Sequence, residues 1–281
     1  MDLRALKDTP PWEWPENTDT RLLELLRDER TSDSDLCLAV ELAGDYTVIN
    51  DALADALLAI IRAHGKSDQI RCTAAISLGP ALEHAYDFDD LDDFDDVTIS
   101  QSEFRRIQES LWKLYLDADV PKDVRRRILE ASVRAPEDWH ADAIRAAYSS
   151  KDEDWRLTAV FGMRHVRGFE TQILDALKSD NEDIHFEAVV AAGAWELDSA
   201  WPHVADLISL ETEKALLLAA IDAVASIRPD EASELLAELG DAEDEDIVAA
   251  AEEAAAMAAA MADATRGDED LDEEDDDEIL S

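Results

Sequence analysis

Histidine and cysteine are the side chains of this sequence that could bind a metal ion or act as nucleophiles, and they are few. They are His64, His84, His140, His165, His185, His203, Cys37 and Cys72. A metal site needs several ligands that converge on one ion, yet the sequence contains no HxxxH, HExxH or CxxC pattern. We therefore expect no metal site, no cofactor and no catalytic residue. We interpret the two cysteines as small buried hydrophobic side chains.

Carboxylates could also bind calcium, and they are concentrated in the run from Asp87 to Asp96. No frame of that run supplies the alternating acids, the glycine at the sixth position and the glutamate at the twelfth that an EF-hand loop requires. Phe88, Leu91, Phe94 and Val97 instead recur every three residues, which gives one apolar stripe if the run is helical. Either the stripe packs back on the protein, or its rings anchor a basic partner while the carboxylates speed the encounter. The candidate partner-binding residues are Phe88, Asp89, Asp90, Leu91, Asp92, Asp93 and Phe94.

Tryptophan, which is enriched where proteins grip a partner, occurs seven times. Two of the seven stand in the segment Pro10 to Pro15, whose prolines exclude a regular helix interior. We predict that this segment caps one end of the fold. Trp139, Trp195 and Trp201 lie near predicted turns, and we include them among the candidate partner-binding residues.

Basic residues cluster directly after the acidic run. The cluster consists of Arg105, Arg106, Lys113, Lys122, Arg125, Arg126 and Arg127. Two interpretations remain open: the acidic run folds back on these bases, or the cluster binds an acidic partner or a small anion.

The overall charge limits the ligands. The 281 residues include 69 Asp and Glu against 25 Lys and Arg, a formal charge of −44. Nucleic acids and anionic lipids bind through Lys and Arg, so we expect neither as a ligand and favour a basic protein partner. No apolar stretch reaches the 18 or more residues of a membrane span, and no signal peptide is visible in the first 14 residues. We therefore expect a cytoplasmic protein, and favour a monomer.

The elements that position these residues repeat along the chain. An acidic turn is followed by a large apolar residue, and small or apolar residues follow at helical steps. The anchors of this pattern are Leu36, Ile70, Val124, Trp155, Ile184, Ala215 and Ile247. Their spacings are 34, 54, 31, 29, 31 and 32 residues, and the longest one contains the acidic run. Each anchor opens one amphipathic helix and follows another, and strand patterns do not occur.

These observations predict an all-α protein, an α-solenoid of about seven antiparallel helix pairs. We expect residues 1–19 to form the Pro/Trp capping segment and residues 20–263 to form the solenoid, interrupted by an acidic insert at about 83–102. Residues 264–281, which hold acids almost without apolar side chains, are predicted to be a disordered tail.

The repeat resembles the HEAT-repeat family in its short, PBS-lyase-like variety. The resemblance implies that the second helix of each pair lines a concave face and that Asp and Arg of successive repeats stack in a ladder. The matching positions are Asp68, Asp123, Asp154, Asp183, Arg71, Arg125 and Arg156. Among enzymes with HEAT-like folds, di-iron deoxyhypusine hydroxylases use His-Glu dipeptides, which this sequence lacks. DNA glycosylases use a basic groove, which the charge opposes.

The function that these features favour is a scaffold or adaptor that binds a basic protein and has no catalytic activity. The first alternative is an acidic inhibitor, or DNA mimic, of a nucleic-acid-binding protein. The second, by analogy with PBS-lyase HEAT proteins, is a lyase-type enzyme or the partner of such an enzyme.

Overall fold

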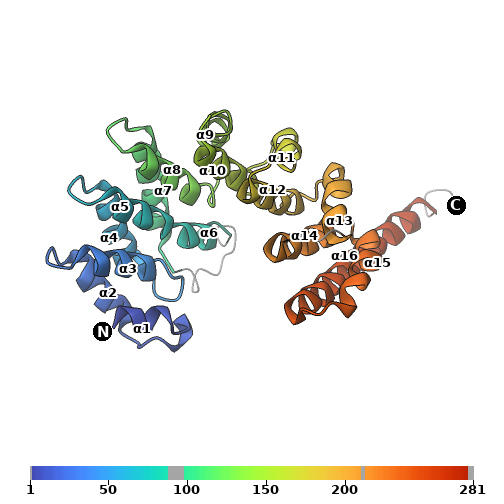
Figure 1. Ribbon diagram of the computed structural model, residues 1–281, viewed down its shortest axis with the longest axis horizontal. Coiled ribbons are helices and arrows are strands. Elements are labelled where there is room, and N and C mark those ends of the chain that lie inside the picture. Colours follow the sequence, from blue (N-terminus) through green and yellow to red (C-terminus); the bar gives the residue numbers. More distant parts are fainter. Residues whose placement is uncertain (1, 88–97, 210–212, 278–281) are drawn as a thin grey trace. The chain divides into compact units, whose positions relative to one another are not determined.

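The regular structure of the protein is helical throughout the residues that can be described. A computed structural model describes residues 2–87, 98–209 and 213–277, with side chains as far as Met261 (Figure 1). No strand occurs in these ranges. The prediction of an all-α protein is therefore confirmed.

The helices follow the predicted pairs. The first helices of the pairs are α2 (Thr18–Arg27), α4 (Asp51–Arg62), α7 (Gln101–Leu116), α9 (Asp138–Tyr148), α11 (Glu170–Ala176), α13 (Trp201–Ser209) and α15 (Pro229–Ala237). The second helices are α3 (Asp33–Ala43), α5 (Asp68–Ile76), α8 (Lys122–Ser132), α10 (Glu153–Met163), α12 (Glu182–Ala194), α14 (Lys214–Ile227) and α16 (Glu245–Asp277). Within each pair the two helices pack against each other.

Further short elements lie outside this pattern. They are the helices α1 (Leu3–Lys7) and α6 (Gly79–Asp87) and the 3-10 turns Pro11–Glu13, Asp198–Ala200 and Glu238–Asp241. Helix α1 packs on α3, and α6 packs on α7 and α8. The repeat pattern did not predict these elements, because each is short and the anchors do not recur in them.

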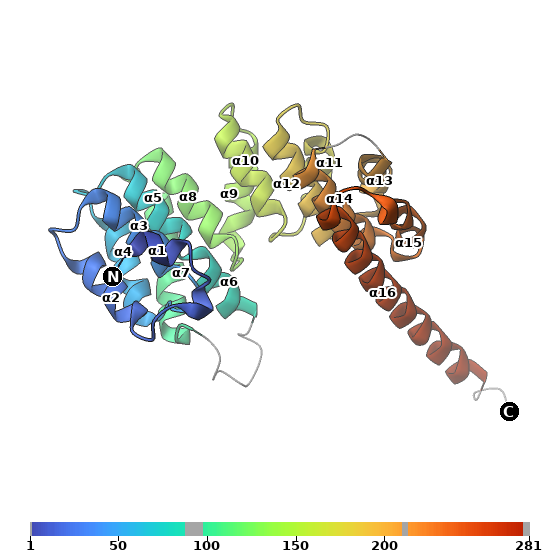
Figure 2. The same cartoon turned by 60° about the horizontal axis from the view of Figure 1, so that its bottom comes forward.

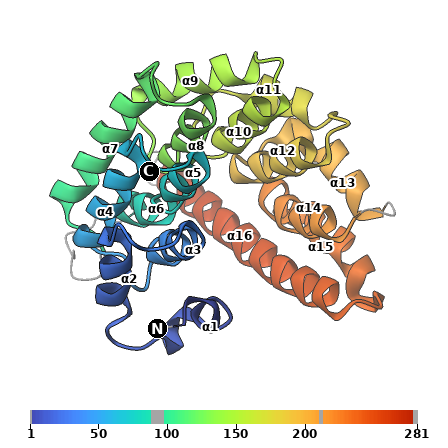
Figure 3. The same cartoon turned by 60° about the vertical axis from the view of Figure 1, so that its left-hand side comes forward.

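The chain divides into two compact units, residues 1–166 (unit 1) and 167–281 (unit 2). In unit 1 the second helices contact one another in the order α3, α5, α8, α10, and the first helices in the order α2, α4, α7 (Figure 3). In unit 2 the second helices α12, α14 and α16 contact in sequence (Figure 2). Second helices therefore pack on second helices in both units, and first helices pack on first helices from α2 to α7 in unit 1.

Side-chain caps explain where many helices begin. Ser32, Ser67 and Ser100 each accept a hydrogen bond from the backbone N–H three residues later. Asn50 and Asn181 accept two such bonds each, at the starts of α4 and α12. Because the first N–H groups of a helix have no partner within it, these side chains fix the helix starts.

Ion pairs with a spacing of 30 residues tie one helix pair to the next. Lys122, the first residue of α8, pairs with Asp152, the N-cap of α10. Lys214, the first residue of α14, pairs with Asp244 just before α16, with 2.7 Å between Nζ and Oδ2. Equivalent positions of two helix pairs are therefore joined in the same way in both units.

The buried arginines correct one position of the expected ladder. Arg71 is buried, donates from Nε to the Ile61 carbonyl at 2.8 Å and lies 3.8 Å from Asp68. In α8 the buried arginine that reaches the next repeat is Arg126 and not Arg125, since its guanidinium lies 3.9 Å from Asp154. Arg126 follows Asp123 by three residues, as Arg71 follows Asp68, so helical geometry selects it.

The N-terminal segment is held by specific contacts. Leu3 and Leu6 are buried in the hydrophobic core of unit 1, and Lys7 Nζ lies 2.8 Å from Glu41 of α3. The indole N–H of Trp14 donates to the carbonyl oxygens of Leu6 and Thr9, at 3.0 and 2.9 Å. That residues 1–19 cap the fold stays a prediction, and the last two of them already belong to α2.

The other predicted boundaries are only partly covered by the described residues. The start of the predicted insert belongs to α6, which ends at Asp87, and residues 88–97 lie outside the described ranges. The backbone of α16 is helical as far as Asp277 (Figure 2). That residues 264–281 are disordered in solution stays a prediction.

Candidate functional site

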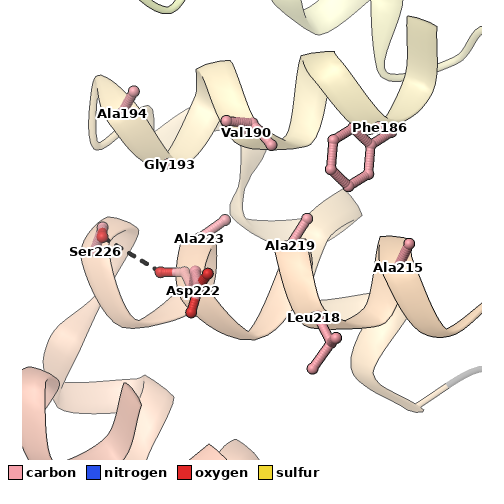
Figure 4. A pocket seen from close by; sticks show the side chains of 10 residues that line it. All are labelled: Phe186, Val190, Gly193, Ala194, Ala215, Leu218, Ala219, Asp222, Ala223 and Ser226. Atoms are coloured by element: carbon pink, nitrogen blue, oxygen red, sulfur yellow. Dashed lines mark hydrogen bonds between the residues drawn. The ribbon is translucent and has the colours of Figure 1, made fainter. Parts of the chain in front are cut away.

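A groove runs between α12 and α14 in unit 2, with a volume of about 560 Å³ (Figure 4). The two helices approach most closely at Gly193, where a Cβ atom would lie 2.9 Å from the Cα atom of Ala223. Glycine is therefore required there for the helices to meet. Figure 4 shows Phe186 of α12 pointing toward α14, and Ala215, Ala219 and Ala223 of α14 pointing toward α12.

The lining of this groove is almost entirely apolar. It consists of Phe186, Val190, Gly193, Ala194, Ala215, Leu218, Ala219, Asp222, Ala223 and Ser226. The Ser226 hydroxyl donates to the backbone carbonyl of Asp222 at 3.3 Å, so it is satisfied within α14. The carboxylate of Asp222 is then the charged group of the lining, which contains no Lys or Arg.

The environment of Asp222 is unfavourable for its negative charge. Burial raises the pKa of its carboxyl above the ordinary value, and Glu253 on α16 raises it further. A cation near this position would relieve both effects.

A second cavity adjoins the groove at Phe186 and Ala215, which line both. It also has a volume of about 560 Å³. Its remaining lining residues are Glu182, Asp183, His185, Leu207, Glu213 and Leu216. An apolar floor therefore continues into a region with three carboxylates, again without Lys or Arg in the lining.

A histidine pair joins α12 to α13 at this second cavity. The Nε2 atoms of His185 and His203 lie 2.8 Å apart, and the ring planes are inclined by 66°. Both side chains are partly exposed. Burial lowers the pKa of each imidazole, and each ring favours the neutral form. One nitrogen can then donate and the other accept.

The candidate tryptophans lie in different surroundings. Trp139, at the start of α9 in unit 1, is half-buried, with its ring centroid 5.1 Å from that of Tyr115. Its indole N–H donates to Glu137 at 3.0 Å. In unit 2, Arg167 lies 4.3 Å over the ring of Trp195, and Arg228 lies 5.5 Å over that of Trp201.

These ring contacts show that the three tryptophans are already engaged within their own units. Whether they also bind a partner stays a prediction. The candidate residues of the acidic run, from Phe88 to Phe94, lie outside the described residues.

Five of the seven bases in the basic cluster of unit 1 form ion pairs with acids among the described residues. Arg106 pairs with Glu103 and with Asp55 of α4, at 2.7 and 2.8 Å, and Lys122 pairs with Asp152. The same holds for Lys113, which pairs with Glu109, and for Arg126 and Arg127, which pair with Glu130. These bases therefore have partners without the acidic run, and the geometry gives no support to an anion site there.

His140 and the cysteines serve structure. His140 is fully buried; its Nδ1 accepts from the Glu137 N–H at 2.8 Å, and its Nε2 lies 3.0 Å from the hydroxyl of Ser132. Burial lowers its pKa to about 4. Cys37 and Cys72 are free thiols and half-buried, so the predicted full burial is only partly observed.

Comparisons of the chain with known proteins identify no family. Among the described residues, no three His, Cys, Asp or Glu side chains are grouped so as to hold a metal ion. In the same part of the chain, no helix has both the length and the apolar character needed to cross a membrane. No protein-family model matches the chain, and a search of curated proteins finds no match.

Proposed function

We propose that the protein is a HEAT-like α-solenoid of about seven helix pairs that acts as a scaffold or adaptor, binds a basic protein and has no catalytic activity of its own. Three features support the architecture: the two helices of each pair pack together, second helices contact second helices within each unit, and ion pairs recur at 30 residues. Stacked helix pairs form long surfaces that suit protein binding.

The observation that carries the proposal is the groove between α12 and α14. An apolar floor gains free energy when a partner's apolar side chains cover it. Alanines on both walls, Ala194 on α12 and Ala215 and Ala219 on α14, leave room for inserted side chains. The groove therefore offers a place where a short apolar segment of a partner can be buried.

Charge determines which partner fits. Asp222 lies in the groove, and Glu182, Asp183 and Glu213 line the adjoining cavity. Carboxylates attract a basic partner during encounter and repel an acidic one, so they contribute to selectivity and association rate. The partner segment that matches is an amphipathic helix with apolar residues on one face and Lys or Arg beside it.

A matched pair of peptides tests this proposal. The probes are a fluorescent amphipathic Leu/Lys helix and its Leu/Glu counterpart, titrated with the full chain at low and high salt. We expect the Leu/Lys peptide to bind, and the Leu/Glu peptide to bind at least tenfold more weakly, about 1.4 kcal/mol. High salt should weaken the first interaction by slowing association.

Variants locate the binding. Phe186→Ala with Leu218→Ala removes the large side chains of the groove and should weaken Leu/Lys binding at least tenfold. The control is Leu116→Ala on α7, which removes a leucine that is 63% exposed and should have no effect. Equal binding of both peptides, or equal losses in the groove variant and the control, would disprove the groove as the site.

A further inference from the structure

The contact between His185 and His203 is not used by the proposed protein binding. Two imidazole nitrogens that belong to different helices face each other at 2.8 Å. At most one proton fits between them, so in the neutral pair one Nε2 carries an unshared electron pair. Neutral imidazole nitrogen is the form that coordinates metal ions.

Each histidine has a carboxylate three residues away on the same helix. Glu182 precedes His185 on α12, and Asp206 follows His203 on α13. Residues three apart lie on the same face of a helix. Glu182 lines the same cavity as His185, and Asp206 acts on the charge state of His203.

The charged groups around the pair favour a cation on balance. Asp183 and Glu213 line the cavity beside His185, and Asp206 lies about one helical turn after His203 on α13. Because His185 lines this cavity and both histidines are partly exposed, an ion can reach the pair from solvent without unfolding the helices.

From this geometry we propose that His185 and His203 bind a divalent transition-metal ion of the Zn²⁺ class between α12 and α13. Zinc–nitrogen bonds of about 2.0–2.1 Å at a tetrahedral angle place two ligand nitrogens about 3.4 Å apart. The two rings would therefore separate by about 0.6 Å relative to their present contact. A change of that size needs only small side-chain rotations.

The site is an open one. No third His, Cys, Asp or Glu completes the coordination in the described part of the chain. Water, or a carboxylate that moves toward the ion, fills the remaining positions. The ion therefore exchanges with solvent and links α12 to α13 beside the groove.

The acidity of the chain decides how the test must be designed, since 69 carboxylates bind divalent cations weakly in many places. Calcium and magnesium prefer oxygen ligands, whereas zinc and cobalt also bind imidazole. The full chain is treated with EDTA, dialysed into buffer with excess Ca²⁺ and titrated with ZnCl₂ by calorimetry. We expect one zinc ion per chain above the calcium background.

The variant that tests the ligands is His185→Gln with His203→Gln, because glutamine keeps a polar side chain of similar length. It should lower zinc affinity at least tenfold, and Co²⁺ should lose its visible absorption band in the same variant. His64→Gln, which changes an exposed histidine of unit 1, is the control and should bind zinc as the parent chain does.

Folding is checked separately. Thermal melting of the metal-free protein, monitored by circular dichroism, shows whether each variant folds. If the double variant does not fold, the two single substitutions are tested in its place. Zinc that binds equally to the parent and the folded double variant, or that shows no binding above calcium, overturns the proposal. Since no peptide is present in this titration, such a result leaves the proposed groove binding untouched.

Discussion

The two units use different means to pack helices of the same pattern. Unit 1 buries polar and charged side chains between its helices, and all such residues in the described part of the chain lie there: Thr18, Arg71, Ser77, Glu103, Ser110, Arg126, Ser132, His140 and Thr158. In unit 2, α12 and α14 approach through Gly193 and Ala223 instead. Buried polar groups need specific partners, so hydrogen bonds between helices add to the apolar packing of unit 1, whereas the described part of unit 2 depends on apolar and small side chains.

The two units also differ in the number of their basic residues. Unit 1 carries 20 Lys and Arg against 35 Asp and Glu, and unit 2 carries 5 against 34. Many bases of unit 1 pair with acids on neighbouring helices. In unit 2 most acids have no base available to them, and the surface remains strongly negative. The comparison teaches that one repeat pattern can carry two different sets of polar residues: bases paired with acids in unit 1, and a large excess of acids in unit 2.

Lowering the pH should reveal the largest difference in stability between the two units, because the buried His140 belongs to unit 1. Its pKa is about 4 in the folded protein and 6.5 without burial. A buried histidine with a lowered pKa contributes stability above pH 6.5 that is lost as the pH falls toward 4. The loss amounts to about 3 kcal/mol. Hydrogen exchange with mass spectrometry, at pH values from 7 to 4, should show loss of protection in unit 1 peptides before unit 2 peptides.

Burial also lowers the pKa of His165 in unit 1 to about 4, and the carboxylates titrate in the same range, so His140 needs its own control. His140→Asn keeps an acceptor near the Glu137 N–H but cannot take up a proton. Its stability should be lower at pH 7 and should change less between pH 6.5 and 4 than that of the parent chain. If parent and variant lose the same stability in acid, or if unit 2 peptides open first, burial of His140 does not explain the difference between the units.

The sequence predicts the helices well because large apolar anchors recur at a nearly constant spacing, and the second helix of each pair begins near one of them. It places Arg125 in the ladder where Arg126 lies, since the repeat was aligned on the apolar anchor Val124 rather than on the acid before it. The pattern does not predict α6, although this helix is as long as α5, because it lies between two helix pairs and carries no anchor of the repeat.

The candidate site could not be found in the same way. An alanine in a helix can pack against a neighbour or line a groove, and Ala188 and Ala219 look alike in the sequence. The structure shows that Ala188 is fully buried while Ala219 lines the groove. The pair of His185 and His203 is separated by 18 residues and by a turn, so only the packing of α13 on its neighbours brings the rings together.

The close approach in unit 2 predicts the next largest effect. Gly193→Ala places a Cβ atom 2.9 Å from the Ala223 backbone, and Ala188→Leu overfills a fully buried position of the same helix. Each change should destabilise the protein by about 1–3 kcal/mol. The free energy of unfolding in urea measures it, and hydrogen exchange should assign the loss to unit 2.

Two substitutions serve as controls for that result. Gly240→Ala adds the same methyl group where nothing lies within 4 Å, and should leave stability nearly unchanged. Ala159→Leu overfills a fully buried position in unit 1, so the loss of protection from hydrogen exchange should appear in unit 1 peptides instead of unit 2 peptides. Should Gly193→Ala melt at the same temperature as the parent chain, small side chains would not be what holds α12 against α14.

The smallest expected effect comes from the two lysines at equivalent repeat positions. Lys122→Gln removes one partner from Asp152, whereas Lys214→Gln removes a partner shared by Asp244 and Asp246. All these groups are exposed, so the ion pairs are screened by solvent and each change should lower the melting temperature only slightly. The decrease should nevertheless be larger for Lys214→Gln, because unit 2 has few other bases to offset its repulsion. In about 1 M salt, where charges are screened beyond roughly 3 Å, the two variants should become equal.

Asp244→Asn provides the complementary change, since asparagine can still cap α16 while one negative charge is removed. If repulsion among the acids of unit 2 causes the larger effect of Lys214→Gln, the melting temperature of Asp244→Asn at low salt should be unchanged or higher than that of the parent chain. A decrease as large as that of Lys214→Gln would show instead that the ion pair itself, and not the surrounding charge, causes the difference between the two lysine variants.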